Sequence, residues 1–125
     1  MMTIIEAISL ADTLKPNDFN QLDKVRWLSN LDGLIKRSII DTHEGSEDIQ
    51  FSEYNESTPL DTVLLVPAPF EDIYIKWLEA QIDYHNNDYA RYNISATAYN
   101  TIYHEYTKHY KEHHMPKQRL SRFLF

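Results

Sequence analysis

Histidines near the C-terminal end of the chain are the residues whose type and spacing could bind a metal ion. His109 and His113 are four residues apart, so on a helix both rings share one face, with Glu112 or His114 as a further ligand. His104 precedes His109 by one residue more than the zincin spacing, which turns the two rings about 140° apart on a helix. Such histidines are more typical of a solvated helix C-terminus, where the dipole favours positive charge. We therefore expect no bound metal, and a metal-dependent enzyme using these histidines and acidic residues is the less favoured alternative.

Paired carboxylates are the other groups with possible chemistry. Glu47-Asp48 and Glu71-Asp72 could act as an acid and a base, but such pairs are more typical of a solvated loop and of a helix start. The chain has no cysteine, which excludes thiol catalysis, disulfides and cysteine-bound zinc together. It also has no Gly-rich phosphate loop. We therefore expect a protein that is not an enzyme and uses no cofactor.

The composition predicts one helical domain. The 125 residues, 42 % hydrophobic and 13 % aromatic, are enough for a single core. Two glycines and five prolines are too few for the many tight turns of a β-sandwich or barrel. The formal charge of −7 argues against broad DNA binding. No apolar run approaches the roughly 20 residues of a membrane span, and the N-terminus has no basic region followed by an apolar one, so we expect neither a span nor a signal peptide.

The best-defined helix is predicted at residues 69–85. Its apolar side chains recur on one face, with charged side chains on the opposite face. Pro69 suits the first turn, where a missing N–H costs nothing, and Asn86-Asn87 mark the end of the helix. The predicted core positions of this helix are Phe70, Ile73, Tyr74, Trp77, Leu78 and Ile82.

Two further helices are predicted before it, at residues 4–14 and 20–42. Thr3 and Glu6 have the spacing of a capping box at the start of the first. Gly33 interrupts the second with a poor helix former, but the apolar period continues through it, so we interpret Gly33 as a close packing point rather than a break. The predicted core positions of the second helix are Leu28, Leu31 and Ile35.

Residues 43–66, which we call the acidic connection, are predicted to be a long loop. Its residues 44–61 contain six Asp and Glu and no Lys or Arg. A connection of this length in a compact domain is typical of a mobile segment or of one ordered by a partner. Residues 62–66 are β-branched and apolar, which predicts a short extended piece that lies on the helices or pairs with a neighbour.

The last helix, predicted at residues 88–113, carries tyrosines in a heptad pattern. Six of the seven residues spaced alternately three and four apart are tyrosine, with Ala96 as the exception. A tyrosine ring is apolar while its hydroxyl seeks a polar partner, so this stripe suits a half-wet interface with another helix or another subunit. We call these residues the tyrosine seam: Tyr89, Tyr92, Tyr99, Tyr103, Tyr106 and Tyr110.

The C-terminal tail, residues 116–125, combines basic and aromatic side chains. An exposed Phe-Leu-Phe end on an acidic protein would favour aggregation, so the tail is expected either to fold back on the body or to dock into another protein. The domain is therefore expected at residues 1–115, followed by a docking tail. The docking residues of the tail are Arg119, Leu120, Arg122, Phe123, Leu124 and Phe125.

Taken together, these segments resemble the head-tail connector (adaptor) proteins of tailed phages and prophages of Gram-positive bacteria. The resemblance covers most of the chain and rests on the order and character of its segments. The segments that carry it are Thr3-Ile-Ile-Glu-Ala-Ile8, Asp23-Lys-Val-Arg-Trp-Leu28, Leu31-Asp-Gly33, Ile40-Asp-Thr-His43, Pro67-Ala-Pro-Phe70, the helix Tyr74–Tyr84, and His114-Met-Pro116.

The resemblance implies a structural role in the virion, with assembly in the cytoplasm of the bacterial host. Such adaptors form a dodecameric ring beneath the portal, extend the DNA channel and offer a platform to the next connector or tail component. By position and character, the tail residues named above would reach into the portal. The acidic connection would face a neighbouring subunit or the channel, where negative charge lets DNA slide. A small helical regulatory module that binds a host factor through the tyrosine seam is the other alternative.

Overall fold

The structure, a computed structural model, describes residues 1–117 of the chain. Four α-helices form the body, and the described residues contain no strand, which confirms the prediction of a small all-α bundle. A π-helical turn, η1, continues α2, and a 3-10 turn, η2, lies in the acidic connection. The elements are α1 (Ile4–Leu14), α2 (Gln21–Ile35), η1 (Lys36–Ile40), η2 (Ser46–Asp48), α3 (Asp72–His85) and α4 (Tyr89–His113).

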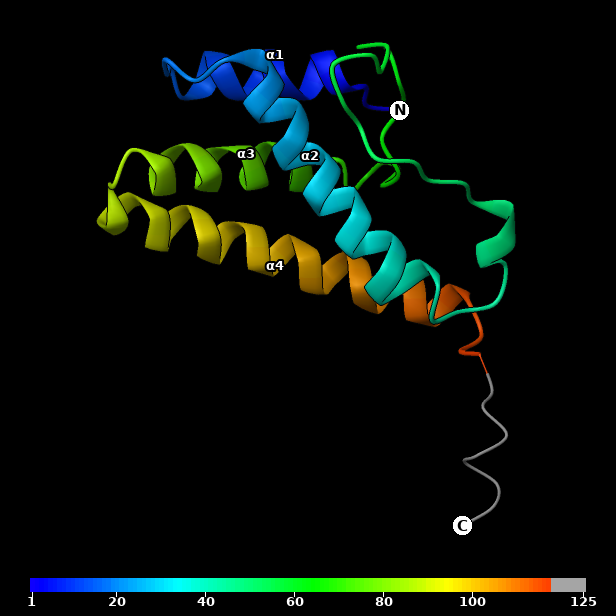
Figure 1. Cartoon of the computed structure of the whole chain (residues 1–125). Coiled ribbons are helices and arrows are strands. Elements are labelled where there is room, and N and C mark those ends of the chain that lie inside the picture. The colour runs from blue at the N-terminus through cyan, green and yellow to red at the C-terminus, as the bar shows by residue number, and fades with distance from the viewer. Residues whose placement is uncertain (118–125) are drawn as a thin grey trace.

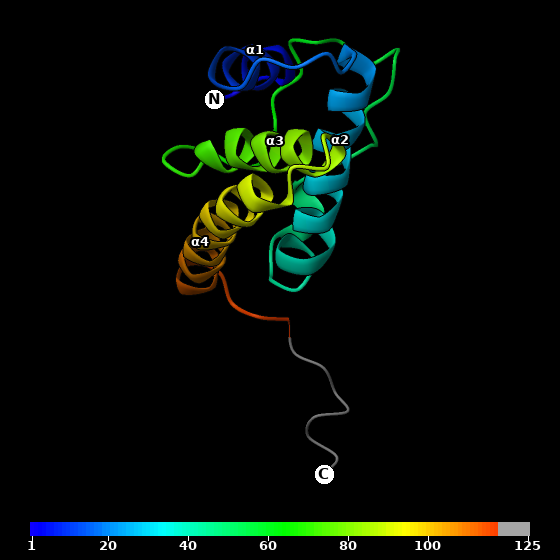
Figure 2. The same cartoon turned by 90° about the vertical axis from the view of Figure 1, so that its left-hand side faces the viewer.

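The helices form two layers. Helices α3 and α4 lie side by side as an antiparallel hairpin, and α1 lies along the other side of α3 (Figure 1). Helix α2 crosses this layer diagonally, and seen along the layer it stands to one side of the other three (Figure 2). The acidic connection runs from the far end of α2 back to the start of α3, past the N-terminus.

Polar caps fix where the first two helices begin. Thr3 accepts a hydrogen bond from the backbone N–H of Glu6 at 3.3 Å and donates its hydroxyl to the Glu6 carboxylate at 3.0 Å. Asn20 accepts from the N–H of Asp23 at 2.8 Å at the start of α2. Each cap satisfies an N–H group that the helix itself leaves without a partner. Helix α1 accordingly has the predicted bounds.

The turn between α3 and α4 is closed by a Schellman motif. Asn87 has a φ of 59°, in the left-handed region, and its N–H donates to the Tyr84 carbonyl at 3.0 Å. The Asp88 N–H donates to the Asp83 carbonyl at 3.0 Å, which completes the motif. Asp88 then caps α4 by accepting from the N–H of Arg91 at 3.2 Å. The hairpin is therefore joined by three residues.

Two of the predicted helices have different bounds in the structure. The helix predicted from residue 69 begins at Asp72, because the N–H of Phe70 donates to Pro67 and that of Ile73 to Phe70 in successive tight turns. The helix predicted to reach residue 42 stops being α-helical at Ile35. In η1 the Asp41 N–H donates to the Lys36 carbonyl, five residues back, at 2.8 Å. This wider turn accompanies the burial of both Ile39 and Ile40.

The core lies where α2 crosses α1 and α3. Seven of the nine predicted core side chains are fully buried, namely Leu28, Leu31, Ile35, Ile73, Tyr74, Leu78 and Ile82. The other two, Phe70 and Trp77, are half-buried and pack against this core from the α4 side. The Trp77 indole N–H also donates to the Trp27 carbonyl at 2.7 Å, which ties α3 to α2.

The end of the acidic connection pairs with the N-terminus. The N–H groups of Ile4 and Ile5 donate to the carbonyls of Thr62 and Leu60, each at 3.0 Å, and that of Leu64 donates to Met2 at 2.9 Å. Leu64 and Val66 are thereby buried in the core. The extended piece predicted at residues 62–66 thus pairs with the first residues of the chain.

The close packing predicted at Gly33 is not required by the structure. A Cβ atom at this position would lie 3.7 Å from the Phe51 ring, an ordinary van der Waals contact. Helix α2 runs through Gly33 without a break. The glycine therefore weakens the helix without serving a contact that a methyl group would prevent.

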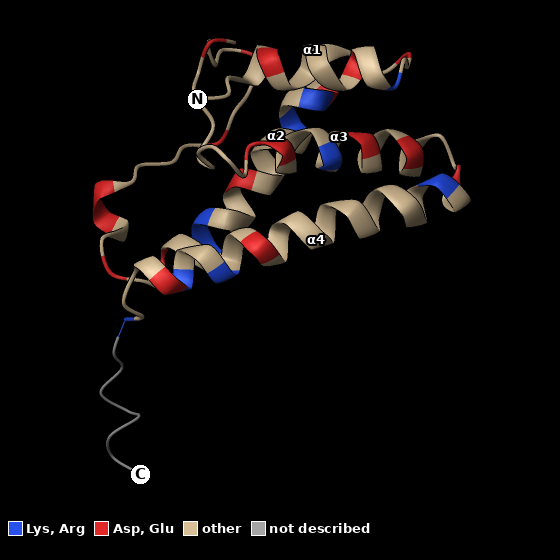
Figure 3. Cartoon of the chain, turned by 180° about the vertical axis from the view of Figure 1, so that it is seen from behind, with Lys and Arg blue, Asp and Glu red and all other residues tan. Residues whose placement is uncertain are grey.

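Charge is unevenly distributed along the chain. In Figure 3, basic residues lie near both ends of α2 and of α4 and on α3, whereas the acidic connection carries acidic residues alone. Among the described helices, none is both long and apolar enough to cross a membrane.

Candidate functional site

The tyrosine seam packs against aromatic residues of α3. Three aromatic residues spaced by seven, two of them in α3 and one in the turn just before it, face three residues of α4 spaced by seven, as expected for antiparallel helices with matched heptads. Their ring centroids lie 5.6 Å apart for Phe70 and Tyr106, 5.0 Å for Trp77 and Tyr99, and 5.4 Å for Tyr84 and Tyr92. The structure thus places most of the seam between two helices of one chain.

Burial varies along the seam. Tyr99 and Tyr106 are buried, and this burial raises the pKa of both phenols above its ordinary value. Tyr92 and Tyr103 are half-buried, whereas Tyr89, beside the hairpin turn, is 57 % exposed. Among the seam residues, only Tyr89 is mostly exposed to solvent and so available to a partner outside the chain.

Tyr110, the last residue of the seam, belongs to a compact cluster with two histidines. The Tyr110 ring stacks on His114 at 3.8 Å between centroids and meets the edge of His43 at 5.3 Å. His43 is itself buried, with its Nδ1 2.7 Å from the Ile39 carbonyl. Within the described residues, the Tyr110 hydroxyl is buried without a hydrogen-bond partner. This cluster packs the end of α4 against the end of η1.

Backbone pairing beside this cluster fixes the point where the C-terminal tail leaves the body. The Glu44 N–H donates to the Met115 carbonyl at 2.8 Å, and the Lys117 N–H donates to the Thr42 carbonyl at 3.0 Å. Residues 42–44 and 115–117 therefore run antiparallel. The predicted docking residues, Arg119, Leu120, Arg122, Phe123, Leu124 and Phe125, lie outside the described residues.

A buried carboxylate organises the acidic connection. Asp32 of α2 is completely buried and accepts the hydroxyls of Tyr54 and Tyr74, each at 2.6 Å. It also accepts the backbone N–H of Leu65 at 3.2 Å. The Tyr74 oxygen in turn accepts the Val66 N–H at 2.7 Å. The carboxylate thus joins α2 and α3 to two separate points of the connection.

Burial and charge both shift pKa values in this network. Burial raises the pKa of Asp32 above its ordinary value, and the hydrogen bonds from Tyr54 and Tyr74 offset this only in part. Burial, followed by the negative charge of Asp32, raises the pKa of both tyrosines. The two phenols therefore remain protonated, and remain hydrogen-bond donors, over the physiological pH range.

Sequence reasoning missed Asp32 as an organising residue. Asp32 lies four residues after Leu28 and three before Ile35, on the same helical face, and this position inside the apolar stripe was the available signal. Asp83 was expected among the charged side chains opposite the core-facing side of its helix, and this expectation was wrong. Asp83 is buried and accepts from Lys15 at 2.5 Å and from the Ser95 hydroxyl at 2.6 Å, which ties the end of α1 to the hairpin.

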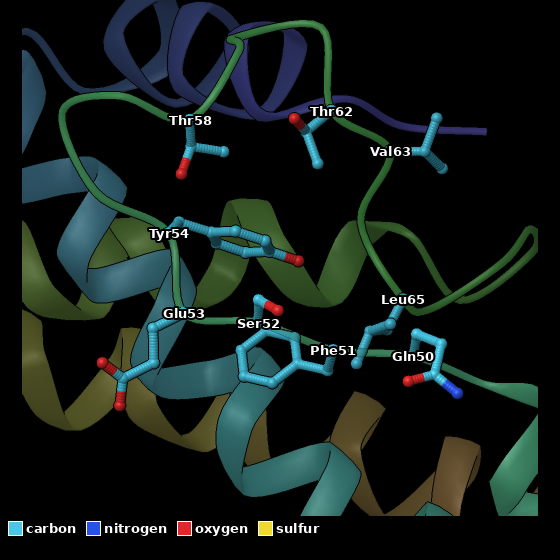
Figure 4. A pocket seen from close by; sticks show the side chains of 9 residues that line it. All are labelled: Gln50, Phe51, Ser52, Glu53, Tyr54, Thr58, Thr62, Val63 and Leu65. Atoms are coloured by element: carbon cyan, nitrogen blue, oxygen red, sulfur yellow. The ribbon is translucent and has the colours of Figure 1, made fainter.

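The ordered connection encloses a small pocket (Figure 4). The pocket has a volume of about 220 Å³ and lies between residues 50–54 and 58–65. Phe51, Val63 and Leu65 supply apolar walls, and Glu53 is exposed at its margin. The Phe51 ring meets the edge of Tyr54 at 5.4 Å. Tyr54, which donates to Asp32, thus also lines the pocket.

The histidines of α4 are placed by stacking. His109 packs against Phe70 at 5.0 Å between centroids and stacks on His113 at 4.2 Å. The Nδ1 of His113 lies 2.8 Å from the His109 carbonyl. Across residues 1–117, no three or more His, Cys, Asp or Glu side chains are grouped so that they could hold a metal ion.

Comparison with known proteins returned no match: no family model, no curated protein and no solved structure matches the chain. What the protein does must therefore be inferred from its own residues.

Proposed function

We propose that the protein is a structural component of a phage virion, a head-tail connector that forms a ring under the portal, extends the DNA channel and joins the head to the tail. The observation that carries this proposal is the fixed departure point of a basic and aromatic tail. Backbone pairing of residues 42–44 with 115–117 gives the tail a defined origin on a rigid helical body. A docking arm with a fixed origin loses less conformational entropy on binding than one on a free terminus.

The chemistry of the tail suits a protein pocket. Phe123, Leu124 and Phe125 supply apolar side chains of the kind that dominate binding energy when they fill pockets, and Arg119 and Arg122 supply charge-assisted hydrogen bonds. In this role the tail inserts into the portal and the helical body remains outside it. The next connector or tail component binds the opposite side of the ring.

Contacts between copies in a ring require two different surfaces on each subunit. Exposed apolar side chains are present on α1, at Leu10 and Leu14, and at the start of α4, at Tyr89 and Ile94. These residues are the first candidates for the contacts between neighbouring subunits. The negative charge of the acidic connection repels phosphate, which suits a surface past which DNA must move.

The test is assembly with portal particles of the same phage or prophage. Mixing the purified chain with portal should give rings, visible by electron microscopy, with a dodecamer as the expected mass of the added layer. A chain ending at Lys117 should lose binding, as should a chain with Phe123→Ala and Phe125→Ala. A protein that remains monomeric beside portal, or that binds equally well without residues 118–125, would contradict the proposal.

A further inference from the structure

The pocket in the acidic connection has a distinct chemistry. Its walls are apolar at Phe51, Val63 and Leu65, and Val63 is 49 % exposed. Glu53 is the one carboxylate in its lining, and residues 44–61 of the connection contain five further Asp and Glu and no Lys or Arg. At about 220 Å³ it is smaller than the roughly 300 Å³ at which small-molecule sites begin, so it suits one or two side chains of a peptide.

The C-terminal tail has the complementary chemistry. Residues 118–125 contain Arg119 and Arg122, four apolar side chains and no carboxylate side chain. Apolar side chains can fill the pocket while the two arginines pair with carboxylates of the connection, of which Glu53 lines the pocket. Both the apolar and the electrostatic character of the surface are therefore matched by one segment of the same chain.

The tail is long enough to reach the pocket of its own chain. Lys117 is hydrogen-bonded to Thr42 at 3.0 Å, and Gln50 at the edge of the pocket lies eight residues after Thr42. That path includes the left-handed turn at Gly45 and the 3-10 turn η2, so it spans less than eight extended residues. The tail also offers eight residues after Lys117, and an extended chain covers about 3.3–3.6 Å per residue.

We propose that residues 118–125 bind back onto the acidic connection of their own chain, with aromatic side chains of the tail in the pocket lined by Phe51, Val63 and Leu65. A tethered segment is present at an effective concentration of the order of millimolar, which favours its own chain over a second copy for a shallow site. The contact covers the apolar tail in the free subunit. It does not depend on which partner later takes the tail, and its test requires no portal.

The test compares amide NMR spectra of the full chain and of a chain ending at Lys117. Removal of residues 118–125 should shift the amides of Phe51, Val63 and Leu65, and this difference should be independent of protein concentration. Adding a synthetic peptide of residues 116–125 to the shortened chain should restore the shifts. A peptide with Phe123→Ala and Phe125→Ala should bind about tenfold or more weakly, because two buried aromatic side chains are lost.

Matched variants of the body test the location. Val63→Ser should weaken binding of the added peptide about threefold to tenfold by removing an apolar wall. Ala90→Ser, at an exposed apolar residue on α4, should leave binding unchanged. Amides of the pocket that do not respond to removal of the tail would overturn the proposal. So would shifts that appear only at high protein concentration, which would assign the pocket to the tail of a second copy.

Discussion

The α3–α4 hairpin and the acidic connection are stabilised in opposite ways. The hairpin is stabilised by aromatic contacts that repeat every seven residues, so each pair contributes a share of the total. The connection contains no such repeat, and its position depends on hydrogen bonds that converge on one carboxylate, Asp32. A repeated interface tolerates the loss of one contact, whereas a convergent network fails at its centre.

The largest effect is expected for Asp32→Ala. This change leaves two buried hydroxyls and the Leu65 N–H without their acceptor, and each unsatisfied donor costs about 1–3 kcal/mol, so the free energy of unfolding should fall by about 4 kcal/mol. Urea denaturation measures the loss, and hydrogen exchange should increase at residues 54–66. Glu56→Gln, on the exposed part of the connection, is the control and should change stability by less than about 0.5 kcal/mol. Unchanged exchange in residues 54–66 would mean that the network does not hold the connection.

The pH dependence of the same residue sharpens this comparison. Because burial places the folded-state pKa of Asp32 above the ordinary value of 3.8, protonation of Asp32 favours the folded state, and this pH-dependent part of its contribution is complete below that value. The contribution is then lost as the pH rises through the folded-state pKa. A carbon NMR titration of the Asp32 carboxyl group should find a pKa above the ordinary value of 3.8. A pKa for Asp32 at or below 3.8 would contradict this expectation.

Trp77→Ala should have the next largest effect. It removes the contact with Tyr99 and the hydrogen bond to the Trp27 carbonyl, and truncation of a packed aromatic side chain costs about 3 kcal/mol. The increase in hydrogen exchange should be spread along α3 and α4. The neighbouring aromatic pairs remain, and each of them carries a share of the stability of the hairpin. Tyr99→Phe keeps the ring and should be nearly neutral. A loss confined to the connection would contradict the distinction between the two regions.

Asn87→Ala should lower the free energy of unfolding by about 1 kcal/mol, since the left-handed conformation that Asn87 adopts at the hairpin turn is less favourable for alanine. Asn87→Gly, which adopts that conformation freely, is the matched variant and should equal or exceed the wild-type stability. Thermal unfolding followed by circular dichroism distinguishes the two. Equal destabilisation by alanine and glycine would point to the side chain of Asn87 rather than to its backbone.

The smallest effect is expected for Gly33→Ala, and it should be stabilising. The new methyl group has room beside Phe51, and alanine is favoured over glycine in a helix by up to about 1 kcal/mol. Urea denaturation should show a small increase in the free energy of unfolding. A decrease would mean that the Phe51 ring cannot accept a neighbour at 3.7 Å.

The helices of the hairpin could be predicted from the sequence better than the hydrogen bonds that order the acidic connection. The bounds of α1, the position of α4 and the buried face of α3 could be predicted, because each depends on spacing within one segment. The aromatic pairing of Phe70 with Tyr106 and of Trp77 with Tyr99 could have been inferred from two matching heptads. What the seam faces was left open between a helix and a subunit, and the structure places it against α3.

The partners of the organising carboxylates could not be predicted, because they are distant in sequence. Asp32 bonds residues 22, 33 and 42 positions away, and Asp83 bonds Lys15 from 68 positions away. No local pattern indicates such partners. The acidic connection was predicted to be a long loop from its charge and composition. No periodic pattern in the sequence indicates the hydrogen bonds that order its middle.

The pairing of residues 42–44 with 115–117 has a mechanical consequence. The Lys117 N–H is bonded to Thr42 at the end of η1, and the Met115 carbonyl is bonded to Glu44. A pull on the C-terminal tail is therefore shared between two helical ends instead of unwinding α4 from its last turn. These two hydrogen bonds close the chain between residues 42 and 117 into a loop, so tension applied to the tail acts on η1, and through it on α2, as well as on the end of α4.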